Sequence, residues 1–336
     1  MQCLLAAAAL GGDALPDAKT VVFLGDSITH SGQYIAFLET ALLAETDRRF
    51  SILNLGLSSE TVSGLSEEGH AGGKFPRPDL HERLDRVLKI TRPDLVIACY
   101  GMNCGIYEPL DPGRFQKFKD GISWMREKCR AAGANVIHLT PPTHDSLKRA
   151  GVAPGYNAVL ATYGGWLLEQ RKNGWDVIDI HGPMDARLAE KRKKDPDAFI
   201  SKDGVHPGAE GHWLMAQLIL RHWRVDCDYT TEDFSPGGRL GELHALVSKR
   251  QRVLAASYLS EAGHKRPGVA PGLPLEQAIR QAAELDAPIE RAVSARRKIA
   301  APSSIYCPLH TRHHRCWRFA LGAPERRRPA HRPRQS

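Results

Sequence analysis

The sequence predicts a three-layer α/β/α fold with a five-stranded parallel sheet, followed by a C-terminal helical extension. Five short apolar runs alternate with segments of helical periodicity. Strands in this arrangement need crossover connections, which are right-handed in nearly all proteins. The runs are continuously apolar, as expected for strands that are buried on both faces. The 336 residues exceed the length that one such sheet uses, which leaves room for the extension.

The predicted strands and helices alternate along the first two thirds of the chain. The strands are predicted at 20–24, 50–55, 95–100, 135–139 and 175–180. The helices are predicted at 32–45, 80–90, 112–132, 155–172 and 208–224. Such helices cover both faces of the sheet, and side chains that follow the carboxyl ends of parallel strands gather at one rim. Functional residues are therefore expected at this rim.

Composition divides the chain into four segments. Segment 1–18 is apolar and short, typical of the remnant of a signal peptide or of an uncleaved terminus. Segment 19–226 holds the α/β domain. Segment 227–300 predicts two amphipathic helices, at about 235–263 and 275–298, which pack on the main domain or link it to partners. Segment 301–336 is a basic tail whose composition predicts disorder.

The charge of the protein lies mostly in this tail. Segment 301–336 holds eight arginines and one glutamate, so it contributes seven of the formal net charge of +8. No stacking aromatic module accompanies the charge, and we do not expect a nucleic acid as partner. Its cysteines and histidines match no common zinc finger, so no metal is predicted. They are Cys307, His310, His313, His314 and Cys316.

Cysteine usage and hydropathy say little about the compartment. The seven cysteines show no spacing typical of a disulfide framework. No apolar run reaches the 18 residues of a membrane-spanning helix, so no membrane span is predicted. The apolar N-terminal segment favours a secreted or periplasmic location slightly over a cytoplasmic one.

A candidate nucleophile follows the first predicted strand. Ser27 comes after the apolar run 21–24 and Gly25, at the start of a helix-like segment. This position is the carboxyl end of a buried strand, where open α/β sheets bind their ligands. A serine in this place can equally be a helix N-cap with a structural role.

A candidate base lies in the loop before the last predicted helix of the domain. A serine hydroxyl needs an imidazole in hydrogen-bond reach, and the imidazole needs an acceptor on its other nitrogen. Asp203 and His206 are three residues apart, so the carboxylate can fold back onto the ring. The alternative is an exposed loop in which Asp203 caps the helix and His206 is solvated.

Two strand ends offer donors for a developing oxyanion. Gly56 ends the second predicted strand and can present its backbone N–H because it has no side chain. Asn103 follows the third predicted strand and can donate from its amide. Taken alone, both are ordinary turn residues.

The order of these motifs resembles the SGNH subgroup of the GDSL esterase and lipase family. Gly-Asp-Ser, Asn-x-Gly, Gly-x-Asn and Asp-x-x-His follow one another between residues 19 and 224. The resemblance implies a flavodoxin-like fold, with Ser27 as nucleophile, Gly56 and Asn103 as oxyanion donors beside the Ser27 N–H, and Asp203 with His206 as the acid–base pair. The third motif usually ends in aspartate, and Cys104 stands there instead.

Other polar residues at the same rim are candidates for lining a substrate pocket. They are Asp26, His30, His144 and His181. His181 is also a competing base, because Asp179 lies two residues before it on the predicted fifth strand and would point to the same side.

The predicted function is hydrolysis of carboxylic esters through a serine acyl-enzyme, without cofactor or metal. No long apolar lid segment is present, which favours short acyl groups such as those of acetylated carbohydrates over lipids. The substrate is thus a small-molecule or carbohydrate ester. The alternatives are a lysophospholipase or thioesterase with the same site, and a non-catalytic binding module on the same fold.

Overall fold

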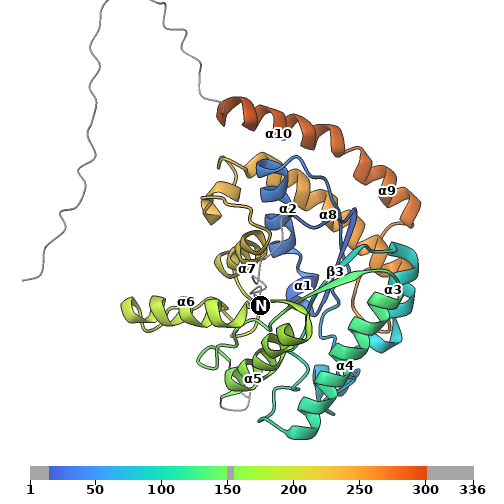
Figure 1. The fold of residues 1–336 in the computed structure, drawn as a ribbon, viewed down its shortest axis with the longest axis vertical. Coiled ribbons are helices and arrows are strands. Elements are labelled where there is room, and N and C mark those ends of the chain that lie inside the picture. Colours follow the sequence, from blue (N-terminus) through green and yellow to red (C-terminus); the bar gives the residue numbers. More distant parts are fainter. Residues whose placement is uncertain (1–14, 150–154, 301–336) are drawn as a thin grey trace, which may run out of the picture. The chain divides into compact units, whose positions relative to one another are not determined.

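The computed structural model describes residues 15–149 and 155–300, and these form an α/β fold around one sheet (Figure 1). The sheet has the strand order β2-β1-β3-β4-β5, and all neighbouring strands are parallel. Its strands are β1 (Thr20–Gly25), β2 (Ser51–Asn54), β3 (Leu95–Cys99), β4 (Asn135–Leu139) and β5 (Asp176–Ile178). The predicted three-layer fold with five parallel strands is confirmed.

Helices cover both faces of this sheet. On one face, α2 (Gln33–Glu45) packs against α7 (Ala209–His222). The other face carries α3 (Leu84–Thr91), α4 (Pro112–Ala131) and α5 (Tyr156–Glu169). Right-handed crossovers explain this division of the helices. The connection from β1 to β2 runs across the sheet in one direction and the connections from β2 to β5 run in the opposite direction, so their helices lie on opposite faces.

The central strand β1 shows why the apolar run becomes a buried strand. Its residues 21–24 are fully buried, and β2 and β3 satisfy its backbone on both sides. A continuous Val-Val-Phe-Leu run therefore meets helices on both faces and water on neither. The strand ends at Gly25, where a Cβ would lie 2.7 Å from the Cys99 carbonyl oxygen, so only glycine fits.

Three predicted elements differ from the observed ones. The fifth strand ends at Ile178, and a helix not predicted, α6 (His181–Lys194), follows it. The predicted helix 80–90 is a short 3₁₀ turn, η2 (Leu80–Glu82), followed by α3. The second extension helix is broken into α9 (Leu275–Ala283) and α10 (Asp286–Ala300). The other 3₁₀ turns of the described residues are η1 (His70–Gly73), η3 (Gln170–Asn173) and η4 (Thr231–Phe234).

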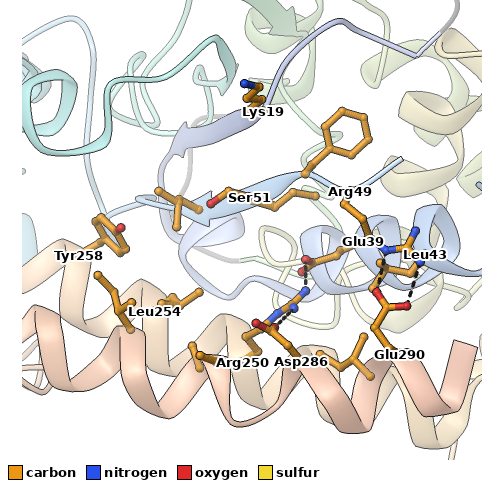
Figure 2. A pocket seen from close by; sticks show the side chains of 17 residues that line it. Lys19, Glu39, Leu43, Arg49, Ser51, Arg250, Leu254, Tyr258, Asp286 and Glu290 are labelled. Carbon is orange, nitrogen blue, oxygen red and sulfur yellow. Dashed lines mark hydrogen bonds and ion pairs between the residues drawn. The ribbon is translucent and has the colours of Figure 1, made fainter. Parts of the chain in front are cut away.

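The extension covers the open edge of the sheet. Helix α8 (Gly241–Ala262) contacts β2, α2 and α3, with α9 and α10 outside it. Gln251 on α8 donates to the Ile52 carbonyl at 3.1 Å, which satisfies an edge group of β2. A cavity of about 650 Å³ lies between these elements. Figure 2 shows the side chains that line it, with Arg250 paired to Glu39 and Asp286.

Several predictions lie outside the described residues. These are the signal-peptide interpretation of the first 14 residues and the disorder and metal questions of 301–336. Within 15–149 and 155–300, no helix is long and apolar enough to cross a membrane. The same ranges contain no group of three or more His, Cys, Asp or Glu side chains placed to hold a metal ion.

Candidate active site

Ser27 lies at the first position of a short helix that leaves β1. Helix α1 (Ser27–His30) begins after Asp26, whose side chain caps it by accepting from the Ile28 N–H at 3.0 Å. The cap therefore belongs to Asp26, and the Ser27 hydroxyl is left for other contacts. Burial raises the pKa of Asp26 to about 6, although the Ile28 N–H opposes this shift.

The structure brings Ser27, His206 and Asp203 into one hydrogen-bonded chain. Ser27 Oγ lies 2.8 Å from His206 Nε2, and His206 Nδ1 lies 2.6 Å from Asp203 Oδ2. The other oxygen of Asp203 accepts from the backbone N–H groups of Val205 and His206, at 3.0 and 2.8 Å. One carboxylate thus shapes the loop and orients the ring.

The charge on Asp203 determines which nitrogen of His206 carries the proton. Partial burial works against ionisation, but hydrogen bonds from the His206 ring and from the two backbone N–H groups outweigh it and lower the pKa of Asp203 to about 2. An ionised carboxylate only accepts hydrogen bonds, so Nδ1 of the neutral ring must donate to it. Nε2 then carries a lone pair and accepts from the Ser27 hydroxyl.

Asn103 is held with a defined orientation of its amide. Its Oδ1 accepts from Arg77 Nη1 at 2.9 Å and from the Tyr107 hydroxyl at 3.1 Å. Its Nδ2 makes a long hydrogen bond of 3.4 Å to the Glu60 carbonyl. Arg77 is itself fixed by a two-pronged pair with Glu67, each bond 2.6 Å. The two donors on Oδ1 fix the orientation of the amide, and since Nδ2 donates one of its two hydrogens to Glu60, the other is available to a ligand.

The Gly56 N–H is engaged by another partner, and Gly56 does not line the cavity at Ser27. That N–H donates to Asn54 Oδ1 at 2.9 Å, and the Gly56 carbonyl bonds to His30 Nδ1 at 3.0 Å. The glycine is needed for a different reason, since a Cβ there would lie 2.5 Å from the His30 nitrogen. Ser59 lines the cavity at Ser27 instead, with a left-handed φ of 67° and no partner for its N–H among the described residues.

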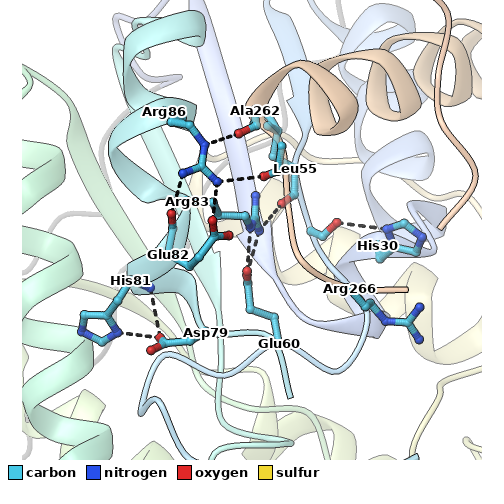
Figure 3. A network of polar contacts seen from close by, with 12 residues as sticks. His30, Leu55, Glu60, Asp79, His81, Glu82, Arg83, Arg86, Ala262 and Arg266 are labelled. Carbon is cyan, nitrogen blue, oxygen red and sulfur yellow. Dashed lines mark hydrogen bonds and ion pairs between the residues drawn. The ribbon is translucent and has the colours of Figure 1, made fainter. Parts of the chain in front are cut away.

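A buried ion pair supports the loop that carries these groups (Figure 3). Arg83 binds both oxygens of Glu60, at 2.6 and 2.7 Å, and also donates to the Leu55 carbonyl at 2.7 Å. The Tyr100 hydroxyl donates to the same carboxylate at 2.6 Å. Both charged side chains are fully buried. The pair therefore fixes the chain on each side of Ser59 and also the carbonyl that Asn103 contacts.

The cavity at Ser27 is polar. It has a volume of about 600 Å³ and includes Asn103 and His206. Three arginines and two glutamates line it, together with Ser58, Ser59, His70 and Tyr107. Ile106 and Ala71 supply most of its apolar side chains. An apolar tunnel for a long acyl chain is thus not part of this cavity.

The four other predicted pocket residues do not line this cavity. Asp26 is buried beneath Ser27 as the cap of α1. His30 bonds to the Gly56 carbonyl. His144 is buried, and its Nδ1 contacts Ser146. His181 begins α6, and its Nδ1 contacts the Pro141 carbonyl.

The competing Asp179–His181 pair does not form. The predicted strand ends before Asp179, so the two residues do not share one side of a strand. Asp179 instead accepts from the Thr140 hydroxyl and from the Gly182 N–H, at 3.0 and 3.1 Å. The carboxylate thus binds an N–H group in the first turn of α6 and the hydroxyl that follows β4, and it does not bind the His181 ring.

Cys104, which stands where the third motif usually has aspartate, is fully buried in the core. Burial raises the pKa of its thiol to about 12. The side chain is therefore neutral, and it does not line the cavity at Ser27.

The model of the GDSL-like lipase/acylhydrolase family matches residues 23–214. No curated protein matches the sequence. Among solved structures, BT4096, described as a gut microbial diltiazem-metabolizing enzyme, has 22% identity and a TM-score of 0.53. That match covers 64% of this chain and 49% of the other, so this chain spans about half of that protein.

Two further structures are similar. LAE5, described as an alpha/beta hydrolase enzyme from the metagenome of Lake Arreo, Spain, has 21% identity and a TM-score of 0.50, over 65% of this chain and 99% of its own. Axe2, an acetylxylan esterase from Geobacillus stearothermophilus, has 17% identity and a TM-score of 0.47, over 61% and 94%. The likenesses to BT4096 and LAE5 concern the fold alone. The family match, which covers more than half of the chain, shows that this protein belongs to the GDSL-like lipase/acylhydrolase family and is an ester-hydrolysing enzyme.

Proposed function

We propose that the protein hydrolyses carboxylic esters with short acyl groups through an acyl-enzyme on Ser27. The observation that carries the proposal is the chain of hydrogen bonds from Ser27 Oγ through His206 to Asp203, at 2.8 and 2.6 Å. This is the geometry that an activated serine requires, with a base in reach and an acceptor that orients the base.

In the proposed mechanism, His206 Nε2 takes the proton of Ser27 as Oγ attacks the ester carbonyl. The carbonyl oxygen becomes an oxyanion, which accepts from Asn103 Nδ2 and from the N–H groups of Ser27 and Ser59. His206 then gives its proton to the alcohol oxygen, and the alcohol leaves. Water, deprotonated by His206, then attacks the acyl carbon, the bond from that carbon to Oγ breaks, and His206 returns its proton to Oγ as the acid leaves. Ser59 replaces Gly56 as donor in this scheme.

The lining of the cavity supports small polar esters as substrates. Serines and charged side chains predominate in it, and long acyl chains bind in apolar sites. An ester of a carbohydrate hydroxyl with a short acid would present polar groups to these residues. A lysophospholipase or long-chain thioesterase would instead need an apolar channel beside Ser27.

The test is the hydrolysis of p-nitrophenyl acetate by the purified protein and by Ser27→Ala and His206→Ala. We expect both variants to lose roughly a thousandfold or more in kcat, because the nucleophile and its base act as a unit. Ser31→Ala is the matched control, since Ser31 donates to the Ile28 carbonyl and does not line the cavity. Equal rates in all four proteins would favour a non-catalytic binding module.

Chain length separates the two ester classes. We expect kcat/KM to fall as the acyl group of the p-nitrophenyl ester grows from acetyl to decanoyl. A rise along this series would favour the lysophospholipase or thioesterase interpretation over short-chain esters.

A further inference from the structure

The cavity at Ser27 contains two arginines that have no carboxylate partner among the described residues. Arg149 and Arg266 both line it, and neither forms an ion pair within 15–149 and 155–300. The third arginine, Arg77, differs from them because Glu67 binds it through two hydrogen bonds. Partly buried arginines without a counter-charge are costly to keep unless something else neutralises them.

Arg266 reaches the cavity from the helical extension. It lies on the segment after α8 (Figure 3), and its Nε donates to the Ser58 carbonyl at 2.8 Å. Nη1 donates to the Pro267 carbonyl at 2.8 Å, and Nη2 has no partner among the described residues. The guanidinium is therefore fixed next to Ser58 and Ser59 with donors to spare. It lies outside residues 23–214, which the family model matches.

Arg149 lies near the segments that carry Asn103 and His206. Its guanidinium carbon lies 4.7 Å from the centre of the Tyr107 ring, and the hydroxyl of that ring donates to Asn103. A Cβ added to Gly204 would lie 2.9 Å from Arg149 Cβ, so the side chain starts beside the loop that carries His206. The two arginines thus come from different segments to one cavity.

The remaining charges of the cavity do not cancel these two. Glu67 is engaged with Arg77, and Glu108 is exposed and forms no ion pair among the described residues. Burial and then Arg77 lower the pKa of His70, which favours its neutral ring, so His70 neither adds to the positive charge nor offsets it. With three arginines and two glutamates, the lining of the cavity beside Ser27 carries a formal net charge of +1.

We propose that the natural substrate is an acidic ester, whose carboxylate binds to Arg266 and Arg149 while Ser27 attacks the ester bond. This rests on the proposed function of Ser27. A guanidinium recognises a carboxylate through paired hydrogen bonds, which a neutral sugar or alkyl group does not offer. The carboxylate is not changed in the reaction. The helical extension then contributes to substrate choice as well as to folding.

The test uses the full chain and matched pairs of esters. For the acyl side, mono-p-nitrophenyl succinate is compared with p-nitrophenyl butyrate, which has the same number of carbons and no carboxylate. For the alcohol side, an acetylated methyl glucuronoside is compared with the acetylated methyl glucoside. We expect kcat/KM to favour the acidic member of at least one pair by about tenfold or more, because a hydrogen bond to a charged group is worth that much.

Three variants assign the preference to the arginines. Arg266→Gln and Arg149→Gln should each lower the acid-to-neutral ratio of kcat/KM by about tenfold, and Arg266→Lys should restore part of it. Arg252→Gln, an exposed arginine of α8 that does not line the cavity, should leave the ratio unchanged. The ratio should also fall as salt is added.

Each outcome has one meaning. Ratios near one for both pairs in the wild-type protein would overturn the proposal while leaving Ser27-dependent hydrolysis intact. Equal losses on acidic and neutral esters in the arginine variants would also overturn it, since they would indicate a structural role. No Ser27-dependent turnover of any ester would instead reject the proposed function.

Discussion

Asp203 has two tasks that one substitution can separate. Its Oδ1 accepts from two backbone N–H groups, and its Oδ2 accepts from His206 Nδ1. Asparagine can keep the first task through its carbonyl oxygen. Its NH₂ group, however, would face Nδ1 and favour the ring tautomer with the proton on Nε2, which cannot accept from Ser27.

We therefore predict that Asp203→Asn lowers kcat by roughly 10³- to 10⁴-fold with little change in the unfolding midpoint. Asp203 is half-exposed, so its ion pair adds little to stability. Urea unfolding followed by tryptophan fluorescence, measured beside kcat on p-nitrophenyl acetate, checks both parts. A variant that retains a tenth of the activity would show that the tautomer of His206 does not depend on Asp203.

The sequence predicted the residues of this site that belong to motifs, but not those that reach the site only through the path of a loop. Ser27, Asp203 and His206 follow strands or precede a helix, and the structure brings them together as expected. Arg77 and Ser59 lie in the long connection between β2 and α3, where no periodicity or motif marks them. Only the three-dimensional path of that connection places them beside Ser27.

The strands illustrate what apolar runs can and cannot predict. Four of the five runs end within one residue of the observed strand ends, because burial on both faces demands an unbroken apolar sequence. The fifth predicted strand runs two residues past the observed end, because Ile180 is apolar and buried but belongs to the start of α6. Periodicity cannot distinguish a buried strand end from a buried helix start in so short a run.

The buried pair of Glu60 and Arg83 yields a prediction for the connection between β2 and α3. Arg83→Met removes the guanidinium and leaves a carboxylate buried, with only the Tyr100 hydroxyl to solvate it. Breaking a buried pair in this way costs about 3–5 kcal/mol in the free energy of unfolding. Urea denaturation of the variant should show a loss of this size.

Two control variants make the prediction specific. Lys128→Met breaks an exposed pair with Asp85 and should cost less than about 1 kcal/mol. Adding Glu60→Gln to Arg83→Met removes the buried charge and should recover part of the loss, although the bond to the Leu55 carbonyl stays broken. If the double variant is as unstable as the sum of the two single ones, the charges are not coupled.

On the scale of the whole molecule, the helical extension and the α/β domain share one core. The sequence predicted two helices beyond residue 227 and left open whether they pack on the domain. Leu243 and Val247 of α8 are buried, and Ile289 and Val293 of α10 belong to the same core cluster. The side chain of Glu39 on α2 is buried and depends on Arg250 for its counter-charge.

This arrangement predicts different results for two shortened chains. A chain that ends at residue 226 would expose the edge of β2, which Gln251 now contacts, and would leave Glu39 buried without Arg250 and Gln251. An uncovered edge strand beside apolar surface is prone to pairing with other copies. A chain that ends at residue 300 keeps every residue that the structure describes.

We expect the chain ending at 226 to elute as aggregates in size-exclusion chromatography and to lack a cooperative urea transition. The chain ending at 300 should unfold at the same urea concentration as the full protein and hydrolyse p-nitrophenyl acetate at the same rate. A cooperative, active chain ending at 226 would contradict the shared core, and would mean that the helices are an independent attachment whose contacts with β2 and α2 add little to folding. A loss of stability in the chain ending at 300 would place part of the core beyond α10.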